Sequence, residues 1–193
     1  MLTDLPSSLP ALPGYGETSL ADLASSLLAA LGLAEEPNPL WLPAADRVCV
    51  LLVDGLGWEL LRGHQAAAPF LSELAVSGRP LTAGFPAMTA TSLTSLGTGT
   101  PPGQHGVLGY QVAVPGEGRL LNTLRWDSRV DPVGWQPRPT IFERAAAAGI
   151  AGFHVAHPAV LRTGLSAAAL RGALGVAAGT LGRARCRRER RCT

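Results

Sequence analysis

The apolar segment at residues 47–53, Arg-Val-Cys-Val-Leu-Leu-Val, constrains the fold more than any other part of the chain, and Asp54-Gly55 follows it directly. A continuous run of apolar and β-branched residues is typical of a central parallel strand that is covered on both faces. Ligands of open α/β sheets bind beyond the carboxyl ends of such strands, which makes Asp54 a candidate site residue. Its carboxylate is suited to holding a metal ion. The alternative is an Asp that only forms a turn or caps a helix.

Further patterns predict strands that alternate with helices along the chain. A helix should carry Leu20, Leu23, Leu27, Leu28 and Leu31 on one face, and Ser19 with Asp22 resembles a capping pair at its start. A second helix should cover part of 57–77, interrupted near Pro69, with Phe70, Leu71 and Leu74 facing inward. We further expect a strand over 79–85, a short helix over 89–96, a hairpin around 111–124, a helix after the capping box of Thr140 and Glu143 with Gly149 as its stop, a strand over 150–155 and a helix from Ser166 to Ala173.

This alternation predicts an α/β fold, a mostly parallel sheet flanked by helices. We expect three parts: an extended N-terminal arm at 1–17, the α/β domain at 18–180, and a disordered Arg-rich tail at 181–193. Trypsin should remove that tail first.

Composition excludes several functions. All 16 basic residues are Arg, so a Walker-A lysine, a Schiff base and a lysine general base are absent. Six Arg and one Glu fall in residues 183–193, so the rest of the chain carries a net charge of about −3 and has no basic face for a nucleic-acid duplex. The three cysteines suggest no disulfide framework. We see no signal peptide and no run that would span a membrane, and we expect a cytoplasmic protein.

The stretch 84–110 is crowded with hydroxyls and glycines, and a short helix should begin in its Thr-rich part. A hydroxyl at a helix N-terminus, next to a metal, is a sensible nucleophile toward phosphate, because the metal lowers its pKa and the free N–H groups favour an anion. The alternative is a capped surface helix followed by a Gly/Pro loop.

Three elements of this stretch and its surroundings resemble the alkaline phosphatase superfamily, and within it the nucleotide pyrophosphatase/phosphodiesterase (type I phosphodiesterase) family. They are Val-Asp54-Gly, Phe85-Pro86-Ala87-Met88-Thr89, and Thr98-Gly99 followed by Pro102 and His105-Gly106. The resemblance implies an alkaline-phosphatase-like fold, Thr89 as catalytic nucleophile, and Asp54 and Thr89 as metal ligands. It also implies two divalent metal ions, zinc in most members, and a phosphodiester or nucleotide-type small molecule as substrate.

The resemblance covers only the N-terminal part of the family and departs from it in two ways. Ser92 stands where eukaryotic members carry a phosphate-binding Asn, which puts nucleotide specificity in doubt. The family's later ligands, an Asp-x-x-Gly-His element, an Asp-His pair and a last His, have no counterpart after Asp131. We therefore expect an incomplete domain, inactive or weakly active, from a truncated or frameshifted gene or a native short paralogue. The rival interpretation is a non-catalytic α/β binding module or half-domain that pairs with another chain.

The histidines do not replace those ligands. His105 matches a structural His-Gly turn of the family, and His64 is isolated. His154 and His157 flank a predicted strand, and their odd separation would place them on opposite faces, so they are not expected to share a metal. Asp127 and Asp131 are compatible with turns.

Overall fold

The computed structural model describes residues 12–179, so the tail predicted at 181–193 and most of the predicted arm lie outside the described residues. The helices are α1 (Leu20–Ala30), α2 (Trp58–Gly63), the 3-10 turn η1 (Gln65–Ala67), α3 (Pro69–Val76), α4 (Thr89–Thr98), α5 (Pro102–His105), α6 (Pro132–Trp135), α7 (Ile141–Ala147), α8 (Pro158–Leu161) and α9 (Gly164–Leu170). The strands are β1 (Gln111–Ala113), β2 (Leu120–Asn122), β3 (Phe153–Ala156) and β4 (Leu174–Ala177).

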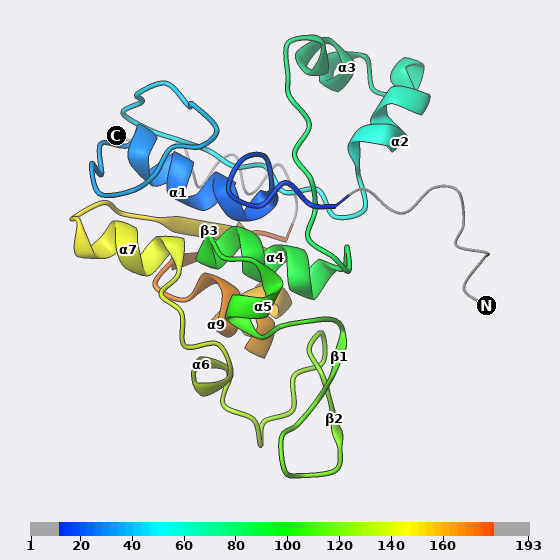
Figure 1. The fold of residues 1–193 in the computed structure, drawn as a ribbon, viewed down its shortest axis with the longest axis vertical. Coiled ribbons are helices and arrows are strands. Elements are labelled where there is room, and N and C mark those ends of the chain that lie inside the picture. The colour runs from blue at the N-terminus through cyan, green and yellow to red at the C-terminus, as the bar shows by residue number, and fades with distance from the viewer. Residues whose placement is uncertain (1–11, 180–193) are drawn as a thin grey trace, which may run out of the picture.

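Helix α4 lies at the centre of the helical part and packs against α1 and α9 (Figure 1). Small residues allow this close approach. Gly97 faces the α9 backbone so closely that an added Cβ would lie 1.9 Å from the Ala169 carbonyl oxygen. Ala24 and Leu28 of α1, together with Ala168 and Ala169 of α9, are fully buried. The helix that carries the candidate nucleophile is therefore closely packed on two sides.

Two tryptophans join the two hydrophobic clusters. Trp126 and Trp135 pack edge to face, with ring centroids 6.4 Å apart, and both contact each cluster. One cluster centres on Ala90, Val107 and Leu165, and the other lies under the β1–β2 hairpin. The hairpin is thus connected through the tryptophans to the first turn of α4.

The strands form two separate pairs. Strands β1 and β2 pair antiparallel, with Val112 opposite Leu121, and β3 and β4 pair parallel, with Val155 opposite Val176. This mixture of helices and small sheets is consistent with an incomplete α/β domain, but the mostly parallel sheet that we predicted does not form among the described residues.

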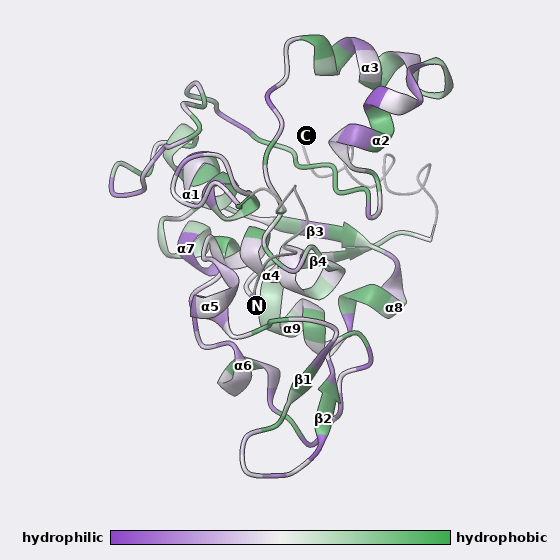
Figure 2. Ribbon diagram, turned by 45° about the vertical axis from the view of Figure 1, so that its right-hand side comes forward, coloured by the Kyte–Doolittle hydropathy of each residue, from purple (hydrophilic) through white to green (hydrophobic). Residues whose placement is uncertain are grey.

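Two of the predicted strands are wrong. Residues 47–53 form no strand, and Leu51 and Leu52 are 73% and 60% exposed. Figure 2 shows this apolar stretch on the ribbon that leads into α2. An apolar run becomes a strand only where neighbours bond its backbone, and no described strand pairs with it. Of residues 79–85, only Thr82 makes a bridge, to Ser19.

The inward direction predicted for the 57–77 helix is also wrong for two of its three residues, whereas Leu71 is half-buried. The break near Pro69 is confirmed, because α3 begins there, but Phe70 and Leu74 are 69% and 56% exposed. Helices α2 and α3 stand away from the rest of the chain (Figure 1) and contribute no buried residue. Their main contacts are with each other and with η1, and several of their apolar side chains remain exposed.

Predictions that rested on local signals are confirmed. The Asp22 carboxylate accepts hydrogen bonds from both the N–H and the hydroxyl of Ser19 at the start of α1. Thr140 and Glu143 form the capping box of α7, and Gly149 follows that helix with a positive φ of 78°. The hairpin, the helix at 89 and the strand near 153 also form close to their predicted positions.

Candidate active site

Thr89 is the first residue of α4, and Met88 before it is extended, so the helix starts abruptly. The first backbone N–H groups of a helix have no partner within it, and the helix dipole adds partial positive charge there. Thr89 is exposed, whereas Ala90 behind it is fully buried in the core. Packing of Ala90 therefore fixes the first turn and leaves the Thr89 hydroxyl accessible to solvent.

Asp54 reaches this hydroxyl across 35 residues of sequence. Thr89 Oγ1 lies 3.3 Å and 3.2 Å from the two carboxylate oxygens of Asp54 and donates a hydrogen bond to them. Gly55, with a positive φ of 76°, turns the chain immediately after Asp54. The two side chains are as close as a shared metal ion would require, within about 5 Å. They meet at the end of the 47–53 segment, which is not part of a sheet.

The described residues do not complete a metal site around this pair. Between residues 12 and 179, no group of three or more His, Cys, Asp or Glu side chains is close enough to hold a metal ion. As metal ligands, Asp54 and Thr89 would be two of the three or four protein ligands that an ion such as zinc normally takes. The donor set fits part of a metal shell and no more.

His105 is a structural residue. It is 1% exposed, its Nδ1 accepts the Val107 N–H, and its Nε2 lies 3.0 Å from Ser95 Oγ. Since Nδ1 accepts, the proton resides on Nε2 and is donated to Ser95. Burial lowers the pKa of His105 to about 4, so the ring is neutral near pH 7. It connects α5 to α4 and faces no solvent.

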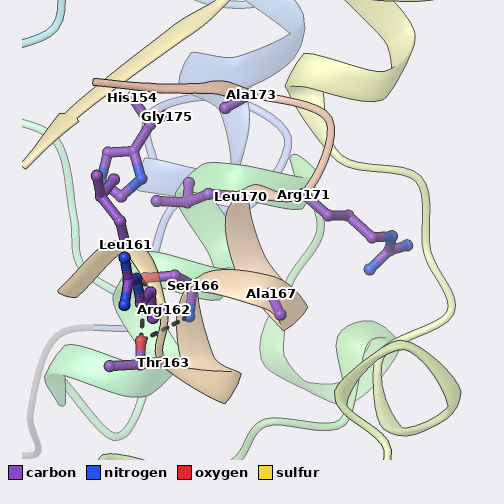
Figure 3. A pocket seen from close by; sticks show the side chains of 10 residues that line it. All are labelled: His154, Leu161, Arg162, Thr163, Ser166, Ala167, Leu170, Arg171, Ala173 and Gly175. Carbon is purple, nitrogen blue, oxygen red and sulfur yellow. Dashed lines mark hydrogen bonds between the residues drawn. The ribbon is translucent and has the colours of Figure 1, made fainter. Parts of the chain in front are cut away.

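The other histidines lie apart from Asp54 and Thr89. His64 is exposed, with Nδ1 3.1 Å from the Leu60 carbonyl oxygen. His157 caps α8 by accepting the Ala159 N–H. His154, on β3, has a pKa lowered by burial and lines a hollow of about 210 Å³ (Figure 3).

That hollow offers little chemistry. Half of its ten lining residues are apolar or glycine: Leu161, Ala167, Leu170, Ala173 and Gly175. The others are His154, Arg162, Thr163, Ser166 and Arg171. The Ser166 hydroxyl is already bonded, since it donates to the Val160 carbonyl and accepts from Thr163. Arg171 points away from it in Figure 3 and bonds Glu143 instead. The pair of Asp54 and Thr89 is therefore the stronger candidate.

Two aspartates that we left without a role are structural. Asp127 accepts hydrogen bonds from Arg129 and Arg119, which hold the pKa of its carboxyl well below the usual range. Asp131 caps α6 by accepting the N–H groups of Val133 and Gly134.

The sequence analysis did not identify Tyr15, whose hydroxyl accepts the N–H of Phe85, four residues before Thr89. No local pattern marks this residue, because the contact joins positions 70 residues apart.

One of three comparisons with known proteins finds a match. Neither a curated protein nor a solved structure matches the chain. Among the described residues, none of the helices has the length and apolar character needed to cross a membrane. A sequence model of the type I phosphodiesterase / nucleotide pyrophosphatase family matches residues 48–171, more than half of the chain, and includes both Asp54 and Thr89. The chain therefore belongs to the type I phosphodiesterase / nucleotide pyrophosphatase family.

Proposed function

We propose that this chain carries the nucleophile and one metal-binding carboxylate of a hydrolase that cleaves phosphodiester or pyrophosphate bonds in nucleotide-type small molecules. The observation that carries the proposal is the contact of 3.2–3.3 Å between Thr89 Oγ1 and Asp54 at the start of α4. Family membership supports the class of reaction. Thr89 is the catalytic residue, and Asp54 and Thr89 are ligands of one of two divalent ions, zinc by analogy with the family.

The proposed reaction proceeds in two displacements. Thr89 Oγ1 forms a bond to phosphorus while the bond from phosphorus to the leaving oxygen breaks. Asp54 is the group placed to receive the hydroxyl proton, because the hydroxyl already donates to it, and this proton then goes to the leaving oxygen. Water then attacks phosphorus of the diester formed on Thr89. Its OH group stays on phosphorus, the bond from phosphorus to Thr89 Oγ1 breaks, and the other water proton restores the Thr89 hydroxyl. The free N–H groups at the start of α4 favour the phosphate anion throughout.

The test is a single-turnover assay with bis-p-nitrophenyl phosphate and added zinc, because two ligands are too few for full activity. We expect at most about one equivalent of p-nitrophenol per chain, with the remaining p-nitrophenyl phosphoryl group found on Thr89 by mass spectrometry after an acid quench. Thr89→Ser keeps a hydroxyl and should retain the release, whereas Thr89→Ala should abolish it. Equal release from wild type and Thr89→Ala would contradict the assigned nucleophile. Sustained turnover with stoichiometric zinc would contradict the incomplete ligand set.

A binding function is the second candidate, and one observation favours it. Val50, Leu51, Leu52 and Val53 are all at least 46% exposed in consecutive positions. Contiguous exposed apolar residues mark interaction surfaces in soluble proteins. An α/β half-domain that pairs with another chain would cover them.

Sedimentation velocity of the purified chain tests this second function. If 47–53 is an interface, Leu51→Asp should shift an associated species toward monomer. Val76→Asp, at an 88% exposed apolar position on α3, is the matched control and should leave association unchanged. If the wild-type chain is monomeric at every concentration measured, the segment 47–53 is not an interface between copies of this chain.

A further inference from the structure

We propose that the segment 14–20 positions the nucleophile, and that Tyr15 is the positioning residue that fixes the backbone leading into α4. The inference rests on the proposed function, because it assigns Tyr15 a role in holding Thr89. Its evidence is a set of contacts between the segment 14–20 and residues 82–85.

Backbone and side-chain hydrogen bonds tie these two segments together. Thr82 is the centre: its N–H donates to the Thr18 carbonyl at 2.8 Å, and its carbonyl accepts the Leu20 N–H at 2.9 Å. The Thr82 hydroxyl also accepts the Gly14 N–H at 2.8 Å. Leu20 begins α1, and α1 packs against α4. The hydrogen bonds of Thr82 therefore fix the position of segment 82–85 relative to α4, the helix that begins with Thr89.

Tyr15 extends this connection toward Thr89. Its hydroxyl accepts the Phe85 N–H at 3.3 Å. Gly84 fits between Tyr15 and Pro102, since a Cβ there would lie 3.2 Å from the Tyr15 hydroxyl and 3.1 Å from Pro102 Cγ. Tyr15 itself is 40% exposed, so its hydroxyl contributes a directed contact more than core packing.

The chain between Phe85 and the nucleophile has little other support. Phe85 is 69% exposed, and the Met88 N–H bonds only locally, to the Pro86 carbonyl. Thr89 follows four residues after Phe85 and must meet Asp54. A shift of the Phe85 backbone would therefore act on Thr89 from its N-terminal side, whereas the packing of Ala90 holds it from the other side. Misplacement of a nucleophile by about 1 Å costs up to about a hundredfold in rate, and loss of one neutral hydrogen bond causes a smaller shift.

Tyr15→Phe removes the hydroxyl and keeps the ring, and Tyr110→Phe is the matched control. Tyr110 is 45% exposed, and its hydroxyl makes no hydrogen bond within residues 12–179. We expect Tyr15→Phe to slow phosphorylation of Thr89 by about three- to tenfold at saturating substrate, with half-saturation unchanged. We also expect it to shift the Thr89 methyl NMR resonance and to speed hydrogen exchange at the Phe85 amide. Tyr110→Phe should change none of these.

The two proposals fail in distinguishable ways. If wild type never phosphorylates Thr89, the proposed nucleophile fails, and the Thr89 methyl resonance still decides the role of Tyr15. An unchanged methyl resonance in Tyr15→Phe, together with an unchanged rate wherever the rate is measurable, would overturn the positioning role. A lower melting temperature with no change at Thr89 would also overturn it, because Tyr15 would then be only structural.

Discussion

Gly97→Ala tests whether the close contact of α4 with α9 holds the helix of the proposed nucleophile in place. An added Cβ would lie 1.9 Å from the Ala169 carbonyl oxygen, 2.9 Å from its carbon and 3.1 Å from Leu170 Cδ2. Two of these atoms belong to the α9 backbone and cannot move by a rotamer change. The two helices would have to separate by more than about 1 Å at a close-packed contact.

Two opposing terms set the magnitude. Replacing Gly by Ala within a helix is worth about 1 kcal/mol in favour of the variant. Overpacking a close contact costs about 1–3 kcal/mol, and a backbone obstruction places this site at the upper end of that range. The net expectation is a destabilisation of about 2 kcal/mol, or a fall in melting temperature of about 4–8 °C for a chain of this size.

Urea unfolding followed by circular dichroism measures this change, and Gly103→Ala is the matched control. Gly103 lies in α5, and an added Cβ there meets nothing within 4 Å, so that variant should be at least as stable as wild type. A Gly97→Ala chain as stable as Gly103→Ala would refute the packing argument. It would show that α4 and α9 do not approach as closely as described.

Three further predictions concern the surroundings of this helix. Stability should fall as pH drops from about 6.5 to about 4, by up to about 3 kcal/mol, because the folded state binds the His105 proton less readily than the unfolded state does. Urea titrations at several pH values should show this slope flatten in His105→Gln. Thr140→Ala should cost about 1–2 kcal/mol, since Thr140 is fully buried and caps α7, whereas an exposed Thr18→Ala should cost less in the same titration. Asp54→Asn should weaken zinc binding measured by calorimetry, and an equal affinity for zinc in both chains would exclude Asp54 as a ligand.

Whether a sequence prediction was right depends on how far apart in the sequence the interacting residues lie. Capping boxes at Ser19 and Thr140 are settled within three residues, so the sequence contains everything needed to predict them. The hairpin at 111–122 likewise depends on neighbouring residues and forms as expected. The prediction of a central strand at 47–53 was wrong because a strand requires pairing partners that its own sequence cannot supply.

The same distinction between local and long-range interactions applies to the candidate site. Two residues of the site could be named from the sequence, because Thr89 and Asp54 lie in motifs with fixed spacing. Their contact across 35 residues was expected only from the family resemblance. Tyr15 could not be named at all, since neither its type nor its neighbours distinguish it from a surface tyrosine.

The two members of the pair also differ in how firmly the fold holds them. Thr89 is fixed by a buried neighbour, Ala90, and by a helix packed on both sides by α1 and α9. Asp54 is the last residue of an exposed segment that no strand supports. The weakly held position of Asp54 should therefore limit both the metal affinity and the reaction rate. A well-placed Thr89 hydroxyl is of little use if the proposed metal ligand beside it moves. Any element that pairs with 47–53 would stabilise the Asp54 side first. Binding of such an element should therefore raise zinc affinity without shifting the Thr89 methyl resonance. A shifted Thr89 resonance with unchanged zinc affinity would show instead that Thr89 is the less firmly held of the two residues.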